Sequence, residues 1–155
     1  MRLEAATGEL IWKLHAADTN SQVLGNGRLI SRRPLRSGVL VDRDVAYVTA
    51  GMWPSEGVLI YALNAATGSI LWCNDTSDTR YLAQPHAKAY ALTGVAPQGY
   101  LLATDDLLFV PTGRGVPAAF DRATGKLRYF KPSDSKTHGG CWAMLSRNRL
   151  FNGGL

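Results

Sequence analysis

The amino-acid sequence predicts an all-β fold, namely a partial β-propeller of about two and a half four-stranded antiparallel blades. Three observations support this prediction. A ten-residue motif occurs three times, a second motif recurs in phase with it, and helical periodicity is nearly absent. Four antiparallel strands per repeat make one propeller blade. We therefore expect little or no helix outside residues 84–92.

The ten-residue motif predicts a tight turn between two strands. It reads LEAATGELIW at residues 3–12, LNAATGSILW at 63–72 and FDRATGKLRY at 120–129. In such a turn an Asx side chain accepts backbone N–H groups ahead of it, and glycine adopts the positive φ that the loop requires. The predicted turn glycines are Gly8, Gly68 and Gly125.

The second motif predicts a β-hairpin, because each copy is an apolar run, a polar tripeptide and another apolar run that ends in glycine. The copies are SGVLVDRDVAYVTAG from residue 37, QGYLLATDDLLFVPTG from residue 98 and GGCWAMLSRNRLFNGG from residue 139. In the first repeat the predicted strands run from the propeller axis outward as residues 37–41, 45–51, 58–63 and 69–72.

The chain is expected to form one partial propeller over residues 1–155, because the repeats give too few blades to close a ring of 4 to 8. The predicted parts are an outer strand of a preceding blade in 1–14, blades in 37–72 and 98–130, and the first half of a further blade in 139–155. A fragment of a longer protein is the favoured interpretation, and several copies completing one ring is the alternative. The sequence shows no export signal and no apolar run long enough for a membrane span.

Residues 62–72 (ALNAATGSILW) resemble the tryptophan-docking repeat A-x-D-x-x-T-G-x-x-x-W of the pyrroloquinoline-quinone-type β-propellers. Quinoprotein alcohol dehydrogenases and the lipoprotein of the outer-membrane β-barrel assembly machinery share this fold. The resemblance implies a periplasmic or cell-envelope location. It also implies that Trp12, Trp72 and Tyr129 dock onto neighbouring blades as structural residues.

Strand parity predicts that the long connections share one side of the propeller, which we call the loop face. These connections are the insertions at residues 13–36 and 73–97 and the shorter loops at 52–56 and 111–115. Insertions gathered on one face often mark the binding side of a repeat protein. The loop face is therefore the expected site of a protein partner, and missing blades of a longer chain are the other expected partners.

Five residues on or near this face are candidates for ligand binding. Cationic, amide and imidazole side chains precede or open three successive inner strands, one arginine can make a bidentate anion contact, and one tryptophan can stack on a planar ligand. These residues are Arg36, Gln98, His138, Arg114 and Trp53. No catalytic residue and no metal-ligand set is assigned, because the carboxylates of this face show no recognisable spacing.

Three function classes remain open, and a non-catalytic binding or scaffold module is favoured. The alternative is part of a quinoprotein alcohol or sugar dehydrogenase. For that alternative the resemblance implies pyrroloquinoline quinone with calcium in the full-length protein, whereas we expect no cofactor in this chain alone. Nucleic-acid binding rests on a net charge of +5 and the arginines at 28, 32, 33 and 36, and no basic stripe with interleaved aromatics supports it. Cys73 and Cys141 are not expected to form a disulfide.

Overall fold

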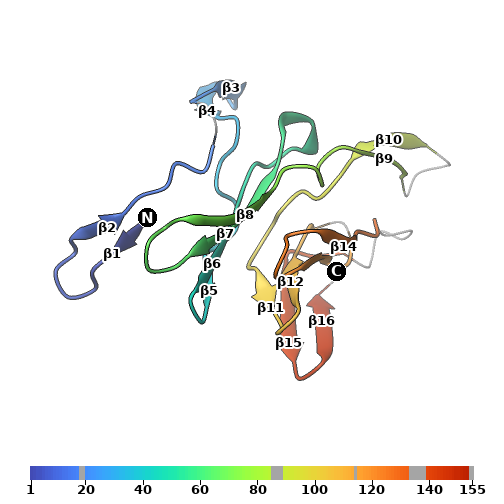
Figure 1. The fold of residues 1–155 in the computed structure, drawn as a ribbon. Coiled ribbons are helices and arrows are strands. Elements are labelled where there is room, and N and C mark those ends of the chain that lie inside the picture. The colour runs from blue at the N-terminus through green and yellow to red at the C-terminus, as the bar shows by residue number, and fades with distance from the viewer. Residues whose placement is uncertain (18–19, 85–88, 114, 133–138, 154–155) are drawn as a thin grey trace.

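The computed structural model describes residues 1–17, 20–84, 89–113, 115–132 and 139–153. The described chain is all-β, as predicted, and its one helical element is the single 3-10 turn η1 (Pro54–Glu56). Two four-stranded antiparallel sheets form the centre of the molecule (Figure 1), and each has its strands in sequence order. The predicted four-stranded blades of a partial propeller are therefore confirmed.

The two complete sheets are called the first and second blades. The strands of the first blade are β5 (Leu40–Asp42), β6 (Val45–Ala50), β7 (Leu59–Asn64) and β8 (Ile70–Asn74). Those of the second blade are β11 (Leu102–Ala103), β12 (Leu107–Val110), β13 (Ala118–Asp121) and β14 (Leu127–Tyr129).

A two-stranded hairpin flanks the complete blades on each side. The C-terminal hairpin pairs β15 (Trp142–Ser146) with β16 (Arg149–Gly153). The N-terminal hairpin pairs β1 (Arg2–Leu3) with β2 (Leu10–Trp12). The sequence predicted a single outer strand within residues 1–14, whereas the structure has two paired strands there, with Leu3 opposite Leu10 across the first copy of the ten-residue motif.

Both long insertions contain a β-hairpin. The first insertion pairs β3 (Gln22–Gly25) with β4 (Arg28–Ser31), and the second pairs β9 (Arg80–Ala83) with β10 (Tyr90–Thr93). The suggestion of a helix in residues 84–92 was wrong for the described part of that segment. A diagonal cross-strand contact stabilises the hairpin instead: the rings of Tyr81 and Tyr90 stack with centroids 5.8 Å apart.

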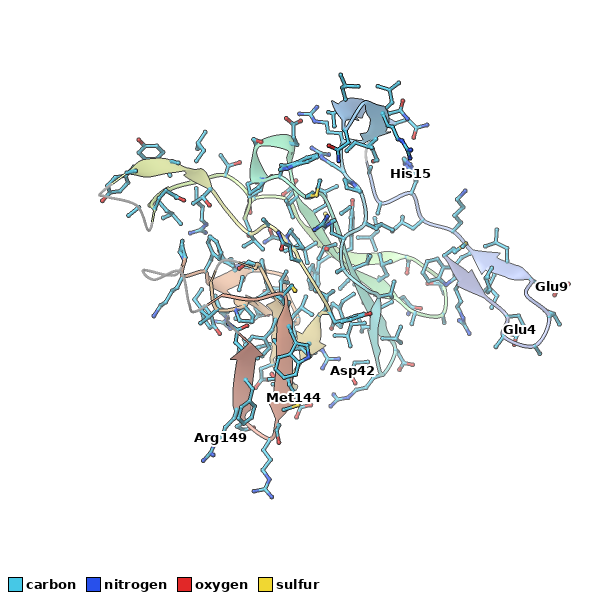
Figure 2. All side chains as sticks on the ribbon, turned by 180° about the vertical axis from the view of Figure 1, so that it is seen from behind. Glu4, Glu9, His15, Asp42, Met144 and Arg149 are labelled. Carbon is cyan, nitrogen blue, oxygen red and sulfur yellow. The ribbon has the colours of Figure 1, made fainter. Side chains whose placement is uncertain are left out.

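The two sides of the propeller are distinct in the structure. In Figure 1 the insertion hairpins β3–β4 and β9–β10 lie above the blades, whereas the ends of the β5–β6 and β15–β16 hairpins point downward. In the view from behind, Asp42 and Arg149 lie at that lower side, which we call the turn face, while His15 lies far above them (Figure 2). The insertions therefore share one face, as strand parity predicts.

Apolar side chains fill both surfaces of the first blade, because another sheet packs on each of its sides. Along β6 successive side chains alternate between faces, so Tyr47 joins one core cluster and Ala46 and Val48 join another. The first cluster includes Phe120 of the second blade, and the other includes Trp12 of the N-terminal hairpin. Burial of strands on both faces thus comes from blade stacking.

The inner ends of successive blades lie side by side, as expected around a common axis. Ser37 and Gly99 form a parallel bridge between the first and second blades. The Gly113 N–H donates to the carbonyl of Gly140 at 3.3 Å, which links the second blade to the segment before β15. A Cβ at Gly99 would lie 1.9 Å from the carbonyl oxygen of Cys141. Such close backbone approach permits only glycine there.

The tryptophan of each repeat lies over the threonine-glycine turn of the next. The Trp12 indole N–H donates to the Ala65 carbonyl at 3.1 Å, and the Trp72 indole N–H donates to the Arg122 carbonyl at 3.0 Å. A Cβ on Gly68 would lie 2.6 Å from the Trp12 ring, and one on Gly125 would lie 2.4 Å from the Trp72 ring. The threonine-glycine turns therefore provide flat surfaces on which these indole rings pack.

The remaining residue of the tryptophan-docking position is the tyrosine at the end of the second blade. Tyr129 lies half-buried in β14 opposite Ala119, and burial raises the pKa of its phenol. Gly8, in the first turn, has a φ of +75°, and within the described parts of the chain no atom of another segment lies within 4 Å of the position of an added Cβ. It is thus a turn glycine without an overlying ring.

Arg122 fastens the first two blades to each other on the turn face. Its guanidinium donates to the Tyr47 hydroxyl at 2.8 Å and to the Thr104 carbonyl at 2.7 Å, and it forms an ion pair with Asp42. The guanidinium carbon also lies 5.5 Å from the centre of the Tyr47 ring, within cation–π range. The arginine side chain is only 10% exposed, so it acts as an internal clamp.

Two further sequence features are settled within the described residues. Cys73 and Cys141 are both exposed and are not joined by a disulfide. No helix in the described ranges has the length and hydropathy needed to cross a membrane.

Candidate functional site

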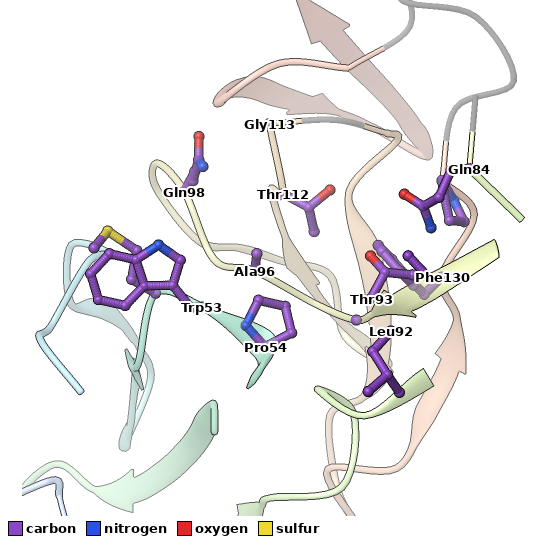
Figure 3. A pocket seen from close by; sticks show the side chains of 14 residues that line it. Trp53, Pro54, Gln84, Leu92, Thr93, Ala96, Gln98, Thr112, Gly113 and Phe130 are labelled. Atoms are coloured by element: carbon purple, nitrogen blue, oxygen red, sulfur yellow. The ribbon is translucent and has the colours of Figure 1, made fainter. Parts of the chain in front are cut away.

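A cavity of about 640 Å³ opens on the loop face between the first and second blades (Figure 3). Its size lies within the range of about 300–1,000 Å³ that is typical of ligand sites. The loop after β6, the second insertion, the loop after β12 and the segment after β14 all contribute to its lining. The walls include the side chains of Trp53, Leu92, Gln98, Thr112 and Phe130.

The loop that carries Trp53 is closed at its base by two glycines and held from outside by two arginines. A Cβ at Gly51 would lie 2.4 Å from the Gly57 carbonyl oxygen, so only glycine permits this approach. Arg32 forms a 2.5 Å ion pair with Glu56, and Arg33 donates to the Glu56 carbonyl at 3.2 Å. These contacts fix the short helical turn next to the indole.

The second insertion is anchored to the first blade by a buried carboxylate. Asp78 is 7% exposed and accepts a hydrogen bond from the Val58 N–H at 2.9 Å. The Val95 N–H donates to the Ser77 carbonyl at 3.0 Å, and Gly94 passes so close to Asp78 that an added Cβ would lie 1.9 Å from its carbonyl oxygen. The cavity wall formed by β10 is therefore tied directly to the blade.

The polar side chains of the cavity belong to the second blade and its entry segment. The Gln98 N–H donates to the Pro111 carbonyl at 2.8 Å, and the Gln98 side chain packs over Gly113, whose φ is +74°. Thr112 is 4% exposed, and its hydroxyl oxygen has no hydrogen-bond partner among the described residues. A buried hydroxyl without a protein partner can hydrogen-bond either an ordered water or a ligand group.

The described lining of the cavity contains no ionisable side chain. It combines apolar and aromatic walls with the amides of Gln84 and Gln98 and the hydroxyls of Thr93 and Thr112. The amides and hydroxyls can hydrogen-bond neutral polar groups of a ligand, while the apolar and aromatic walls can contact an apolar part of it. Nowhere in the described chain do three or more His, Cys, Asp or Glu residues gather in a group able to hold a metal ion.

The structure brings together two of the five predicted binding residues. Trp53 and Gln98 both line the cavity. Arg36 is exposed between the bridged residues Leu35 and Ser37, and it is not part of the cavity lining. His138 and Arg114 lie outside the described residues.

Sequence reasoning missed Thr112, Phe130 and Gln84 as lining residues. Thr112 directly follows the proline that ends an apolar strand in the motif VPTG, and this position in a predicted loop was the signal available for it. Gln84 was placed in the suggested helix, whereas it follows β9. Phe130 has no local signal, because only the packing of the blades brings it to the cavity.

Residues 1–129 match a family model of PQQ-like repeats that is described as outer membrane protein assembly factor BamB. The chain belongs to this PQQ-like repeat family. The match covers the N-terminal hairpin, both insertions and the two complete blades up to Tyr129. The comparison with curated proteins gives no match. Membership of the PQQ-like repeat family agrees with the resemblance in the ten-residue motif.

Proposed function

We propose that this PQQ-like repeat chain is a non-catalytic binding or scaffold module that takes a protein partner on its loop face. The observation that carries the proposal is the 640 Å³ cavity, whose described lining joins apolar walls to neutral amides and hydroxyls. Such a lining suits recognition and offers no acid, base or nucleophile of shifted pKa. The family description, an outer membrane assembly factor, supports a place in the cell envelope.

The described lining does not fit pyrroloquinoline quinone. This quinone is a tricarboxylic acid, so a tight site needs cations for its carboxylates, and calcium needs oxygen ligands that include carboxylates. The described lining supplies neither charge. We therefore propose that residues 1–155 alone do not bind this cofactor tightly.

Calorimetric titration of the chain with pyrroloquinoline quinone, with and without calcium, tests the non-catalytic assignment. The expected result is no stoichiometric binding in the submicromolar range. Tight binding that His138→Ala or Arg114→Ala weakened about tenfold would overturn it and favour the dehydrogenase alternative, since tenfold corresponds to about 1.4 kcal/mol.

Site-directed crosslinking tests the use of the loop face. A photoreactive residue in place of Leu29, which is 67% exposed in β4, is expected to crosslink to proteins of a cell-envelope fraction. The same residue in place of Arg149, on the turn face, serves as the matched control. Equal crosslinking from both faces would contradict a loop-face partner.

A further inference from the structure

Trp53 separates two hollows of the loop face. The larger is the 640 Å³ cavity, and the smaller, about 560 Å³, lies toward the β3–β4 hairpin. Met52 and Trp53 line both, so the two hollows lie on either side of this pair of side chains. We call the two hollows together the groove; its lining includes residues of the first insertion hairpin and of the second.

We propose that this groove binds an extended peptide segment of a partner protein, with an apolar side chain in the larger hollow and an acidic side chain in the smaller one. This inference rests on the proposed binding function and names its ligand. In an extended peptide, side chains a few residues apart can enter neighbouring hollows while the backbone passes over a dividing ring. The indole of Trp53, 37% exposed, is such a ring.

The larger hollow selects an apolar side chain with peptide groups beside it. Its walls are formed by Pro54, Leu92 and Phe130 among others, and its polar groups are neutral. The Thr112 hydroxyl, which has no hydrogen-bond partner among the described residues, and the carboxamide of Gln98 offer both donors and acceptors. A peptide backbone presents one N–H and one carbonyl per residue, which match these groups.

The smaller hollow selects a negative charge. Arg28 lines it and forms no ion pair with any described residue, and the rest of its lining is uncharged. Two nearby arginines are engaged, since Arg32 pairs with Glu56 and Arg33 donates to the carbonyl of the same residue. Arg28 is therefore the cation that the described lining of this hollow offers to a carboxylate of the ligand.

The walls favour a peptide over a glycan. A sugar carries hydroxyl groups around its ring edges, and burial of these groups against apolar walls without hydrogen bonds is costly. Among the described residues that line the larger hollow, apolar side chains outnumber the four polar ones, which are Gln84, Thr93, Gln98 and Thr112. One apolar side chain flanked by its own peptide groups matches a lining that is mostly apolar with a few polar groups.

A set of blocked, fluorescein-labelled octapeptides tests the proposal. Each peptide carries one Leu and one Glu in a Ser-Gly frame, with one to five residues between them, and binding is followed by fluorescence anisotropy. We expect binding at one preferred spacing and at least tenfold weaker binding when Leu is replaced by Ser. Affinity should fall as salt is raised, because one ion pair contributes.

Two variants and one control locate the binding. Thr112→Val keeps the shape of the side chain and removes the hydroxyl, and it should weaken binding about tenfold. Arg28→Glu, at an exposed position of β4, should weaken binding of the Glu peptide and restore binding of the matching Lys peptide. Arg149→Glu makes the same charge change on the turn face and should leave affinity unchanged. Far-UV circular dichroism confirms that each variant is folded.

Each failure has a distinct meaning. If peptides bind but Arg28→Glu and Arg149→Glu behave alike, the groove assignment is wrong while the binding function stands. If no peptide binds and maltohexaose or cellohexaose does, in a way that Thr112→Val weakens, the ligand class is wrong. If only pyrroloquinoline quinone with calcium binds, the proposed function fails together with this inference. If the Thr112→Val variant does not fold, the comparison of Arg28→Glu with Arg149→Glu tests the proposed groove by itself.

Discussion

Gly125→Ala is predicted to destabilise the protein through two separable effects. Gly125 has a φ of +70°, and an alanine in the left-handed region costs about 1–2 kcal/mol. The new Cβ would also lie 2.4 Å from Trp72 Cε3, so the indole must move. This movement breaks the hydrogen bond from the Trp72 indole to the Arg122 carbonyl, which costs about 0.5–1.5 kcal/mol of stability. The movement also removes the contact between the Trp72 and Tyr47 rings, which costs about 0.5–1.5 kcal/mol more.

The expected loss for Gly125→Ala is therefore roughly 2–5 kcal/mol in the free energy of unfolding. The turn of the N-terminal hairpin supplies a natural control. Gly8 has a φ of +75° and nothing near the position of an added Cβ, so Gly8→Ala should cost only the conformational part, about 1–2 kcal/mol. A double-mutant cycle with Trp72→Leu isolates the ring contact, because the shorter side chain leaves room over the turn.

Urea denaturation followed by circular dichroism at 25 °C measures these changes, with linear extrapolation to water. In the Trp72→Leu background, Gly125→Ala should cost about 1–2 kcal/mol, the conformational part alone. If the cost of Gly125→Ala is the same with Trp72 and with leucine, the contact between indole and turn is not what requires glycine, and the reasoning is refuted.

Three further predictions concern ionisable side chains. Arg122→Ala removes the ion pair with Asp42 and the inter-blade hydrogen bonds, and should lower the free energy of unfolding by about 2–4 kcal/mol in urea titrations. The Asp121 pKa is lowered by hydrogen bonds from Thr124 and from the Arg128 side chain. Its carboxylate therefore stabilises the fold above the unfolded pKa, and the advantage over Asp121→Asn should vanish as pH falls through the folded pKa. Desolvation raises the pKa of the Cys73 thiol, so its alkylation, measured with the other cysteine changed to serine, should have a midpoint above that of a free thiol.

The blades were predictable because their turns are determined by local chemistry. Asn64 and Asp121 occupy equivalent positions, and the Oδ1 atom of each accepts two backbone N–H groups of its turn, at 2.9–3.1 Å. Gly68 and Gly125 follow with φ of +75° and +70°. Each of these requirements lies within ten residues of sequence, so the repeats show it directly.

The insertion hairpins were harder to predict because little core supports them. The β3–β4 hairpin did carry a usable signal: Asn26 and Gly27 have φ of +50° and +70°, the conformation that an Asn-Gly hairpin turn favours. The segment around β10 is rich in alanine, which favours helix in isolation. Pairing with β9 and the contact between Tyr81 and Tyr90 outweigh that preference.

The candidate site was predicted only in part because several separate loops form it. Trp53 and Gln98 were found from residue type and from their place next to predicted strands. Thr112 and Phe130 matter because they face the same cavity. That proximity depends on how the second blade packs against the first, and no local pattern records it.

The way the blades dock explains why their function must be sought outside the repeat. Each docking tryptophan donates to a backbone carbonyl, that of Ala65 in one turn and that of Arg122 in the other. A carbonyl is present whatever the side chain, so the residue at this position is free to vary. In the second blade this residue is Arg122, which links the two blades, while in the first blade it is Ala65, whose side chain is a methyl group. The same freedom holds for the loop-face connections, which lie outside the docked turns. Under the proposed function, a ligand would be recognised by features that only some repeats possess, such as Trp53 and Thr112, and not by the motif that all of them share.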